Sequence, residues 1–119
     1  DIVHGDLKPD NILIKRDPGC ASGLVAKVSD FGLAEKMAAE ETHVSGYVGG
    51  TPFYVAPEVV LSHRLTKSSD MYGAGVMLWE VYSGKVPWTM MMGPGQPTHY
   101  NPHFFDIPAW CDPGLQLLL

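Results

Sequence analysis

The chain has 119 residues, enough for one domain or part of one. Hydrophobic residues make up 45% of it, too many for a disordered chain. Its 13 acidic residues outnumber its 8 basic ones and give a formal charge of −5. This balance argues against a nucleic-acid partner, since such proteins need a basic face to neutralise phosphates, and against docking on anionic membranes.

The cysteines and the chain ends carry little further information. Cys20 and Cys111 cannot form a disulfide framework, so we expect two free thiols in a reducing compartment. No apolar run approaches the roughly 18 residues that cross a bilayer, so we expect no membrane segment in this chain. The sequence opens on Asp1 without an initiator methionine or a leader, and stops on Leu119 within an apolar pattern. We therefore expect a chain cut at both ends.

Short strands are expected in the N-terminal part. Two apolar stretches, residues 2–3 and 12–14, flank a charged loop and predict a hairpin-like element. Residues 17–23 have the composition of a turn. A third short strand is expected over residues 25–28, running directly into Asp30.

A long loop and a short helix are expected next. Residues 33–56 lack a clear period and contain several glycines, so they predict a loop too long for a simple connection. Loops of this length are usually functional or mobile. Residues 57–61 predict a short helix with proline in its first turn.

The strongest helix pattern covers residues 67–83, where apolar side chains recur at helical spacing. Ser68 or Ser69 can cap its start, Asp70 lies in its first turn, and Gly84 is expected to end it. Apolar or small residues lie on nearly every side, which predicts a buried helix.

After this helix the periodic pattern breaks down. Residues 87–108 contain five prolines and predict irregular chain. Residues 114–119 are expected to begin a last helix.

Several polar side chains on loops suggest a common chemistry. The oxygens of Asn11 and Asp30 could hold Mg²⁺, which keeps its waters and binds few protein ligands. Lys8 suits an anionic substrate such as a phosphate, and the carboxylate of Asp6 could accept a proton or orient a hydroxyl. Positioning, charge neutralisation and a group that orients the nucleophile are what phosphoryl transfer needs.

Three motifs, in order, give the sequence a clear resemblance to a family. It resembles the protein-kinase catalytic domain. Residues 4–11, His-Gly-Asp-Leu-Lys-Pro-Asp-Asn, are similar to the catalytic loop H-R-D-L-x-x-x-N. Residues 30–32, Asp-Phe-Gly, are similar to the D-F-G motif, and residues 56–58, Ala-Pro-Glu, to the A-P-E that ends the activation segment.

The resemblance implies a mainly α fold of the α+β kinase-like type, a partial C-terminal lobe with short strands around the catalytic loop. The 119 residues contain no glycine-rich loop, strand lysine or helix glutamate of the small ATP-binding lobe. We therefore expect a partial kinase domain over residues 1–119, with that lobe and the C-terminal end absent. Its parts are the catalytic loop 4–11, the activation segment 30–58, the central helix of about 67–83 and the irregular segment 87–108.

The resemblance also implies roles for individual residues. Asp6 is similar to the catalytic aspartate, and Lys8 to the lysine that steadies the transferred phosphate in serine/threonine kinases. Asn11 and Asp30 are similar to the two ligands of Mg²⁺, and with Lys8 they would bind ATP. Thr51 is similar to the threonine that contacts the catalytic aspartate and shapes the pocket for the substrate residue after the phosphoacceptor.

The implied function is transfer of phosphate from Mg-ATP to serine or threonine hydroxyls of a protein substrate, with the tyrosine-kinase-like group as a candidate subgroup. ATP and Mg²⁺ are the implied cofactors. The activity would belong to the full-length parent, and the isolated chain is expected to be inactive. The need for ATP and the cysteine count imply a cytoplasmic protein or the cytoplasmic domain of a membrane protein.

Two rival functions remain open. A pseudokinase or non-catalytic protein-binding module would use the same fold, although intact Asp6, Asn11 and Asp30 argue against it. A small-molecule phosphotransferase of the kinase-like superfamily would generally lack the Ala-Pro-Glu segment that this sequence has.

Structural roles follow from the same resemblance. His4 and Phe31 are similar to the lower members of the hydrophobic column that links kinase lobes, and Asp70 to the aspartate that ties the central helix to the catalytic-loop backbone. Glu58 normally pairs with an arginine nearer the C-terminus, which these residues lack. An unpaired buried charge is costly, so we expect Glu58 to lack a partner and the chain alone to be poorly stable.

Gly5 departs from the motif, which has arginine at this place. That arginine usually meets a phosphorylated residue of the activation loop. Switching by a phosphate on Thr42, Ser45 or Tyr47 is therefore less expected, and the loop should be ordered by other means.

Overall fold

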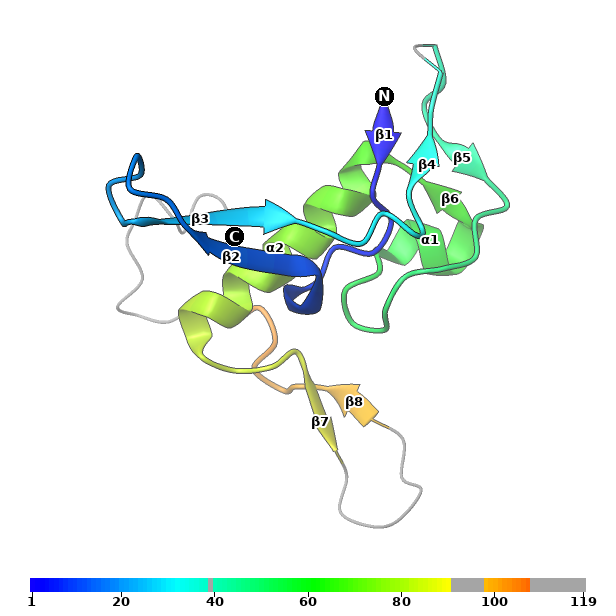
Figure 1. Ribbon diagram of the computed structural model, residues 1–119. Helices are drawn as coiled ribbons and strands as arrows, with labels where there is room; N and C mark the ends of the chain where they lie inside the picture. Colours follow the sequence, from blue (N-terminus) through cyan, green and yellow to red (C-terminus); the bar gives the residue numbers. More distant parts are fainter. Residues whose placement is uncertain (39, 91–97, 108–119) are drawn as a thin grey trace.

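The part of the chain that the structure describes is a mixture of short strands and two α-helices (Figure 1). The computed structural model describes residues 1–38, 40–90 and 98–107. Within these residues the strands form four separate two-stranded sheets, so the expectation of a mainly α fold is too simple and the described part is mixed. The elements are β1 (Ile2–Val3), a 3₁₀ turn η1 (Pro9–Asn11), β2 (Ile12–Arg16), β3 (Leu24–Val28), β4 (Glu35–Lys36), β5 (Val44–Ser45), α1 (Pro57–Ser62), β6 (Arg64–Leu65), α2 (Lys67–Ser83), β7 (Trp88–Met90) and β8 (Thr98–Tyr100).

Strand pairing differs from the expected N-terminal hairpin. β1 pairs with β4, more than 30 residues away, and β2 pairs with β3 in antiparallel register from Ile12 opposite Val28 to Arg16 opposite Leu24. The turn between β2 and β3 is closed by Asp17, whose carboxylate accepts a hydrogen bond from the backbone N–H of Gly19. The strand expected over residues 25–28 therefore lies within β3 and pairs with β2. The expected hairpin between β1 and β2 is wrong.

The residues expected to form one long loop contain two further strands. β4 lies against β1, and β5 lies antiparallel to β6, with Val44 opposite Leu65. Both strands are two residues long. These pairings connect the loop to β1, which precedes it in the sequence, and to β6, which follows it.

Helix α2 has the predicted bounds but a different cap. Thr66 is the N-cap, because its hydroxyl accepts from the N–H of Ser69 while the Ser69 hydroxyl accepts from the N–H of Thr66. Gly84 ends the helix in the left-handed conformation, as expected. The prediction of a helix buried on nearly every side is wrong, since Met71 is 70% and Val81 80% exposed.

The buried face of α2 meets the loop of residues 4–11 (here called the 4–11 loop). A Cβ on Gly73 would lie 2.9 Å from the carbonyl oxygen of Leu7, so only glycine allows the helix to approach this closely. Figure 1 shows α2 running through the middle of the molecule, with the β2–β3 hairpin on one side and β1, β4, β5, β6 and α1 gathered around its N-terminal half. The 4–11 loop connects these two groups.

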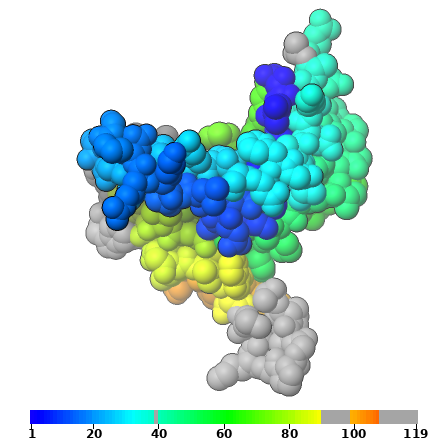
Figure 2. Space-filling model, viewed as in Figure 1, coloured from blue at the N-terminus to red at the C-terminus, as the bar shows by residue number. Residues whose placement is uncertain are grey.

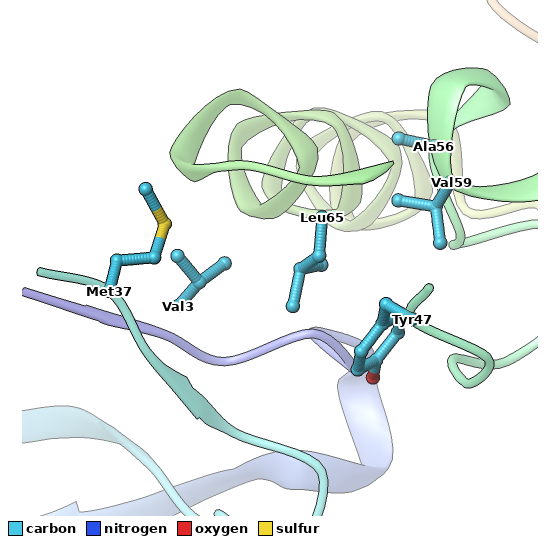
Figure 3. Close-up of a cluster of buried hydrophobic side chains, with 6 residues drawn as sticks. All are labelled: Val3, Met37, Tyr47, Ala56, Val59 and Leu65. Atoms are coloured by element: carbon cyan, nitrogen blue, oxygen red, sulfur yellow. The ribbon is translucent and has the colours of Figure 1, made fainter. Parts of the chain in front are cut away.

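A small hydrophobic cluster joins the elements around the first half of α2 (Figure 3). Burial of apolar side chains at this junction stabilises the arrangement, at about 25 cal/mol per Å² removed from water. The cluster draws on β1, β6, α1 and the segment between β3 and α1, and consists of Val3, Met37, Tyr47, Ala56, Val59 and Leu65. In Figure 2 the β2–β3 hairpin, in blue, lies on the left of the view, and the green residues around the cluster lie on the right.

The C-terminal residues that the structure describes form a hairpin-like pair, not irregular chain throughout. β7 and β8 are antiparallel, with Trp88 opposite Tyr100. Aromatic contacts join this pair to the segment before α1, since the rings of Phe53 and Tyr100 meet edge to face with centroids 4.8 Å apart. The expected last helix and Cys111 lie outside the described residues.

No helix among the described residues is long and apolar enough to cross a bilayer.

Candidate functional site

The 4–11 loop is held by the first turn of α2. Asp70 accepts hydrogen bonds from the backbone N–H groups of His4, at 2.7 Å, and Gly5, at 2.9 Å. Bonds to a charged acceptor are stronger than bonds between neutral groups. The predicted tie between the helix and the loop backbone is confirmed.

Three of the predicted site residues form one network. The hydroxyl of Thr51 donates to Asp6 Oδ1 at 2.6 Å, and Lys8 Nζ donates to Thr51 Oγ1 at 2.7 Å. Lys8 Nζ also lies 3.2 Å from Asp6 Oδ2. The side chains of Lys8 and Asp6 are 21% and 11% exposed, so both groups stay reachable from outside while their positions are fixed.

Asn11 lies beside this network and is 5% exposed. Its side-chain nitrogen donates to the backbone oxygen of Asp6 at 2.8 Å and to Asp6 Oδ2 at 3.3 Å. Its side-chain oxygen accepts no hydrogen bond from the described residues and is free to face a cation. The amide nitrogen of Asn11 therefore orients Asp6.

The chain just before Asp30 is bonded to Asn11. The backbone N–H and the hydroxyl of Ser29 both donate to the backbone oxygen of Asn11, at 2.9 and 3.1 Å. Asp30 itself is exposed, has a φ of 57°, and accepts at its carboxylate from the N–H of Gly32 at 3.2 Å. The pairing of β2 with β3 thus brings Asn11, just before β2, next to Ser29, just after β3.

The donor set fits Mg²⁺. One carboxylate, from Asp30, and one amide oxygen, from Asn11, are the hard oxygen ligands that this ion takes while keeping several waters. Among the described residues no group of three or more His, Cys, Asp or Glu side chains gathers to form a denser metal site.

An aromatic contact connects the 4–11 loop with the residues that follow Asp30. The rings of His4 and Phe31 lie 5.1 Å apart, and His4 Nε2 is 2.9 Å from the backbone oxygen of Ser29. Phe31 is nevertheless 58% exposed. The contact agrees with the expected pairing of these two side chains in one column.

Glu58 is not left without a partner. Its Oε1 accepts from the hydroxyl of Ser69 at 2.9 Å, and the side chain is only partly buried. The expectation of an unpaired buried carboxylate is wrong, because Ser69 in the first turn of α2 reaches it.

A pocket of about 290 Å³ opens beside the network, and sequence reasoning missed most of its residues. Tyr54 donates to Glu80 Oε2 at 2.9 Å, and burial raises the pKa of both groups, most clearly that of Tyr54. The signal in the sequence was that aromatic residues stand next to Thr51. Trp88 of β7 is far from Thr51 in the sequence and reaches the pocket only through the fold. The lining residues are Asp10, Thr51, Pro52, Phe53, Tyr54 and Trp88.

Comparison with known proteins gives the family. The model of the protein kinase domain matches residues 1–103. The chain is 45% identical over 86 residues to LRR receptor-like serine/threonine-protein kinase FEI 2 of Arabidopsis thaliana, covering 72% of this chain and 14% of that protein. It is 44% identical over 84 residues to Cold-responsive protein kinase 1 of the same organism, covering 71% and 20%.

A bacterial relative is nearly as similar. The chain is 39% identical over 87 residues to Probable serine/threonine-protein kinase pknA2 of Bifidobacterium longum (strain NCC 2705), covering 73% of this chain and 11% of that protein. The chain thus spans a fifth or less of the length of these relatives. It belongs to the protein kinase domain family.

Proposed function

We propose that the protein containing this chain transfers phosphate from Mg-ATP to serine or threonine hydroxyls of proteins. The observation that carries the proposal is the network of Asp6, Lys8 and Thr51, in which a carboxylate and an ammonium group are held in fixed positions by one hydroxyl. Fixed positions and charge neutralisation are what phosphoryl transfer requires of a protein.

The roles of the side chains follow from their contacts. Asp6, oriented by Thr51 and Asn11, would hold the substrate hydroxyl and accept its proton as the oxygen attacks phosphorus. Lys8 would neutralise charge on the transferred group. Asn11 and Asp30 would hold Mg²⁺, which would offset the negative charge of the phosphates when bound.

Serine and threonine are the proposed acceptors. Lys8 stands two residues after Asp6 and is bonded to Thr51, the arrangement that the resemblance implies for serine/threonine kinases. The names of the three relatives above include two serine/threonine-protein kinases. The pocket beside Thr51 is the proposed binding site for the substrate side chain next to the phosphoacceptor residue.

The setting of the protein is part of the proposal. We infer a kinase domain that works where ATP is available, in the cytoplasm or on the cytoplasmic side of a membrane protein, since several relatives are named receptor-like kinases. We also infer that residues 1–119 alone are inactive, because they contain no glycine-rich loop or strand lysine to bind the phosphates of ATP.

The test is an assay of the complete kinase domain with Mg-ATP and a generic protein substrate, followed by phosphoamino-acid analysis. Phosphoserine or phosphothreonine is the expected product. Phosphotyrosine alone would contradict the acceptor class. Absence of any transfer would favour the rival function, a non-catalytic protein-binding module.

A further inference from the structure

Tyr47, just after β5, reaches into the space between the 4–11 loop and the residues that follow Asp30. Its side chain is 7% exposed. The phenol oxygen donates towards the backbone oxygens of Gly5, at 3.3 Å, and Leu33, at 3.4 Å. Figure 3 shows the ring beside Val59 and Leu65, with the hydroxyl pointing away from the cluster. One tyrosine thus contacts two loops and the core together.

The space that the side chain of Tyr47 occupies is open because residues 5 and 49 are both glycines. A Cβ on Gly5 would lie 2.5 Å from the phenol oxygen, and a Cβ on Gly49 would lie 2.7 Å from it. Real carbon and oxygen atoms do not approach so closely, so any side chain at either position would displace the tyrosine. Gly5 also has a φ of 78°, which disfavours other residues.

Gly5 stands where the family motif has an arginine. Kinase activation loops are commonly ordered when an arginine pairs with a phosphorylated residue. In this chain the same place is occupied by a neutral phenol bonded to backbone oxygens. The ordering contact needs neither the arginine nor the phosphate.

The electrostatic surroundings of the Tyr47 hydroxyl favour a neutral group at this position. Burial, followed by the charges of Asp6, Glu35 and Asp70, raises the pKa of Tyr47. The same carboxylates would repel a phosphate dianion placed there. The electrostatics and the geometry therefore point the same way.

We propose that Tyr47 is a positioning residue that holds the segment of residues 30–58 against the 4–11 loop without phosphorylation, in the space that glycine at position 5 leaves open. The proposal rests on the proposed function, because the segment includes Thr51 and most of the residues that line the pocket beside it. Tyr47 itself does not touch the reacting atoms.

The first test compares Tyr47→Phe and Tyr47→Ala in the complete kinase domain after phosphatase treatment. Hydrogen exchange is followed at the amide of Tyr47, or of its replacement, which donates to the backbone oxygen of His63 at 3.1 Å in the native chain. Loss of the hydroxyl should speed exchange about fivefold to tenfold, and loss of the ring about a hundredfold. The KM for the protein substrate should rise while the KM for ATP does not, a split that general destabilisation would not produce.

The second test is a double-mutant cycle. Gly5→Ala should displace Tyr47 and speed exchange as much as Tyr47→Ala does, and the two changes together should add little more. Gly23→Ala is the matched control, since Gly23 has a φ of 70° and an added Cβ there would meet nothing within 4 Å. It reports the cost of the backbone strain alone. If Gly5→Ala does not fold, Gly49→Ala makes the same steric test.

The results separate this proposal from the proposed function. Unchanged exchange and substrate KM in Tyr47→Ala, or fully additive effects in the cycle, would overturn it. So would a wild-type segment that loses protection on phosphatase treatment and regains it when Tyr47 is phosphorylated. A domain without any transferase activity would contradict only the proposed function, because the exchange data would still decide the role of Tyr47.

Discussion

At the scale of single residues, the hydroxyl of Thr51 links the carboxylate of Asp6 to the ammonium group of Lys8. Thr51→Val removes the donor to Asp6 and the acceptor for Lys8 while keeping the shape of the side chain. We expect kcat of the complete kinase domain to fall about tenfold to a hundredfold, as for loss of bonds to charged groups. Thr51→Ser keeps the hydroxyl and should stay within about threefold of the wild type. Equal losses in both variants would refute the role of the hydroxyl.

A second prediction at this scale concerns pH. Burial raises the pKa of Glu80, against a smaller lowering by its bond from Tyr54, so the folded state holds its proton more firmly than the unfolded chain does. The contribution of this group to stability is therefore present at low pH and is lost as pH rises through the raised pKa. Glu80→Gln can still accept from Tyr54 but does not ionise. In denaturant titrations from pH 4 to 7, the free energy of unfolding of Glu80→Gln should increase relative to that of the wild type as pH rises. A difference between the two that does not change with pH would contradict this.

The candidate site could be predicted at this scale only in part. Asp6, Lys8 and Asn11 lie within six residues of one another, so their motif is visible in the sequence. The contact of Tyr47 with Gly5 joins residues 42 positions apart and depends on side-chain packing that no local pattern reports. The glycine at position 5 was the one visible sign that something else fills the place of the arginine.

At the scale of elements, Asp70 makes α2 the support of the 4–11 loop. Asp70→Asn replaces a charged acceptor and presents an NH₂ group to two N–H donors. We expect the free energy of unfolding to fall by about 2 kcal/mol, the range for bonds to charged groups. Asp106→Asn is the matched control, because Asp106 is exposed and its carboxylate pairs at the surface with His103, an interaction worth less than about 1 kcal/mol. Chemical denaturation would measure both, and equal effects would contradict the account.

The elements themselves were predictable where the signal is local. The period and the final glycine of α2 lie within its own residues, and its bounds were predicted correctly. Its cap was not, because Thr66, Ser68 and Ser69 are all chemically suited to capping and only the backbone geometry selects Thr66. The pairing of β1 with β4 was missed because strands of two residues carry almost no pattern and their partners are distant in sequence.

At the scale of the whole molecule, exposed apolar surface is the main feature. An open apolar pocket of about 450 Å³ lies between the 3₁₀ turn, β2 and α2, lined by Pro9, Ile12, Ile14, Ala74, Met77, Leu78 and Val81. Large exposed apolar patches usually mark surfaces that contact other protein. The poor stability expected of the chain alone thus has a physical reason other than the one first considered for Glu58.

This feature predicts how residues 1–119 behave when purified alone. We expect them to bind a hydrophobic dye and to unfold with a free energy below about 5 kcal/mol, the lower end for native domains. The complete kinase domain is the comparison and should bind less dye. A sharp, cooperative unfolding transition of residues 1–119 without dye binding would contradict the prediction.

The central claim is that Asp6 is the group that orients the substrate hydroxyl and accepts its proton. The most direct measurement is kcat for phosphate transfer to a protein substrate by the complete kinase domain carrying Asp6→Asn. Asp17→Asn makes the same chemical change in the β2–β3 turn, outside the candidate site, and serves as the control. We predict a fall of about a thousandfold for Asp6→Asn, within the range for loss of an acid–base group, and no more than about twofold for the control. Activity of Asp6→Asn within tenfold of the wild type would contradict the account.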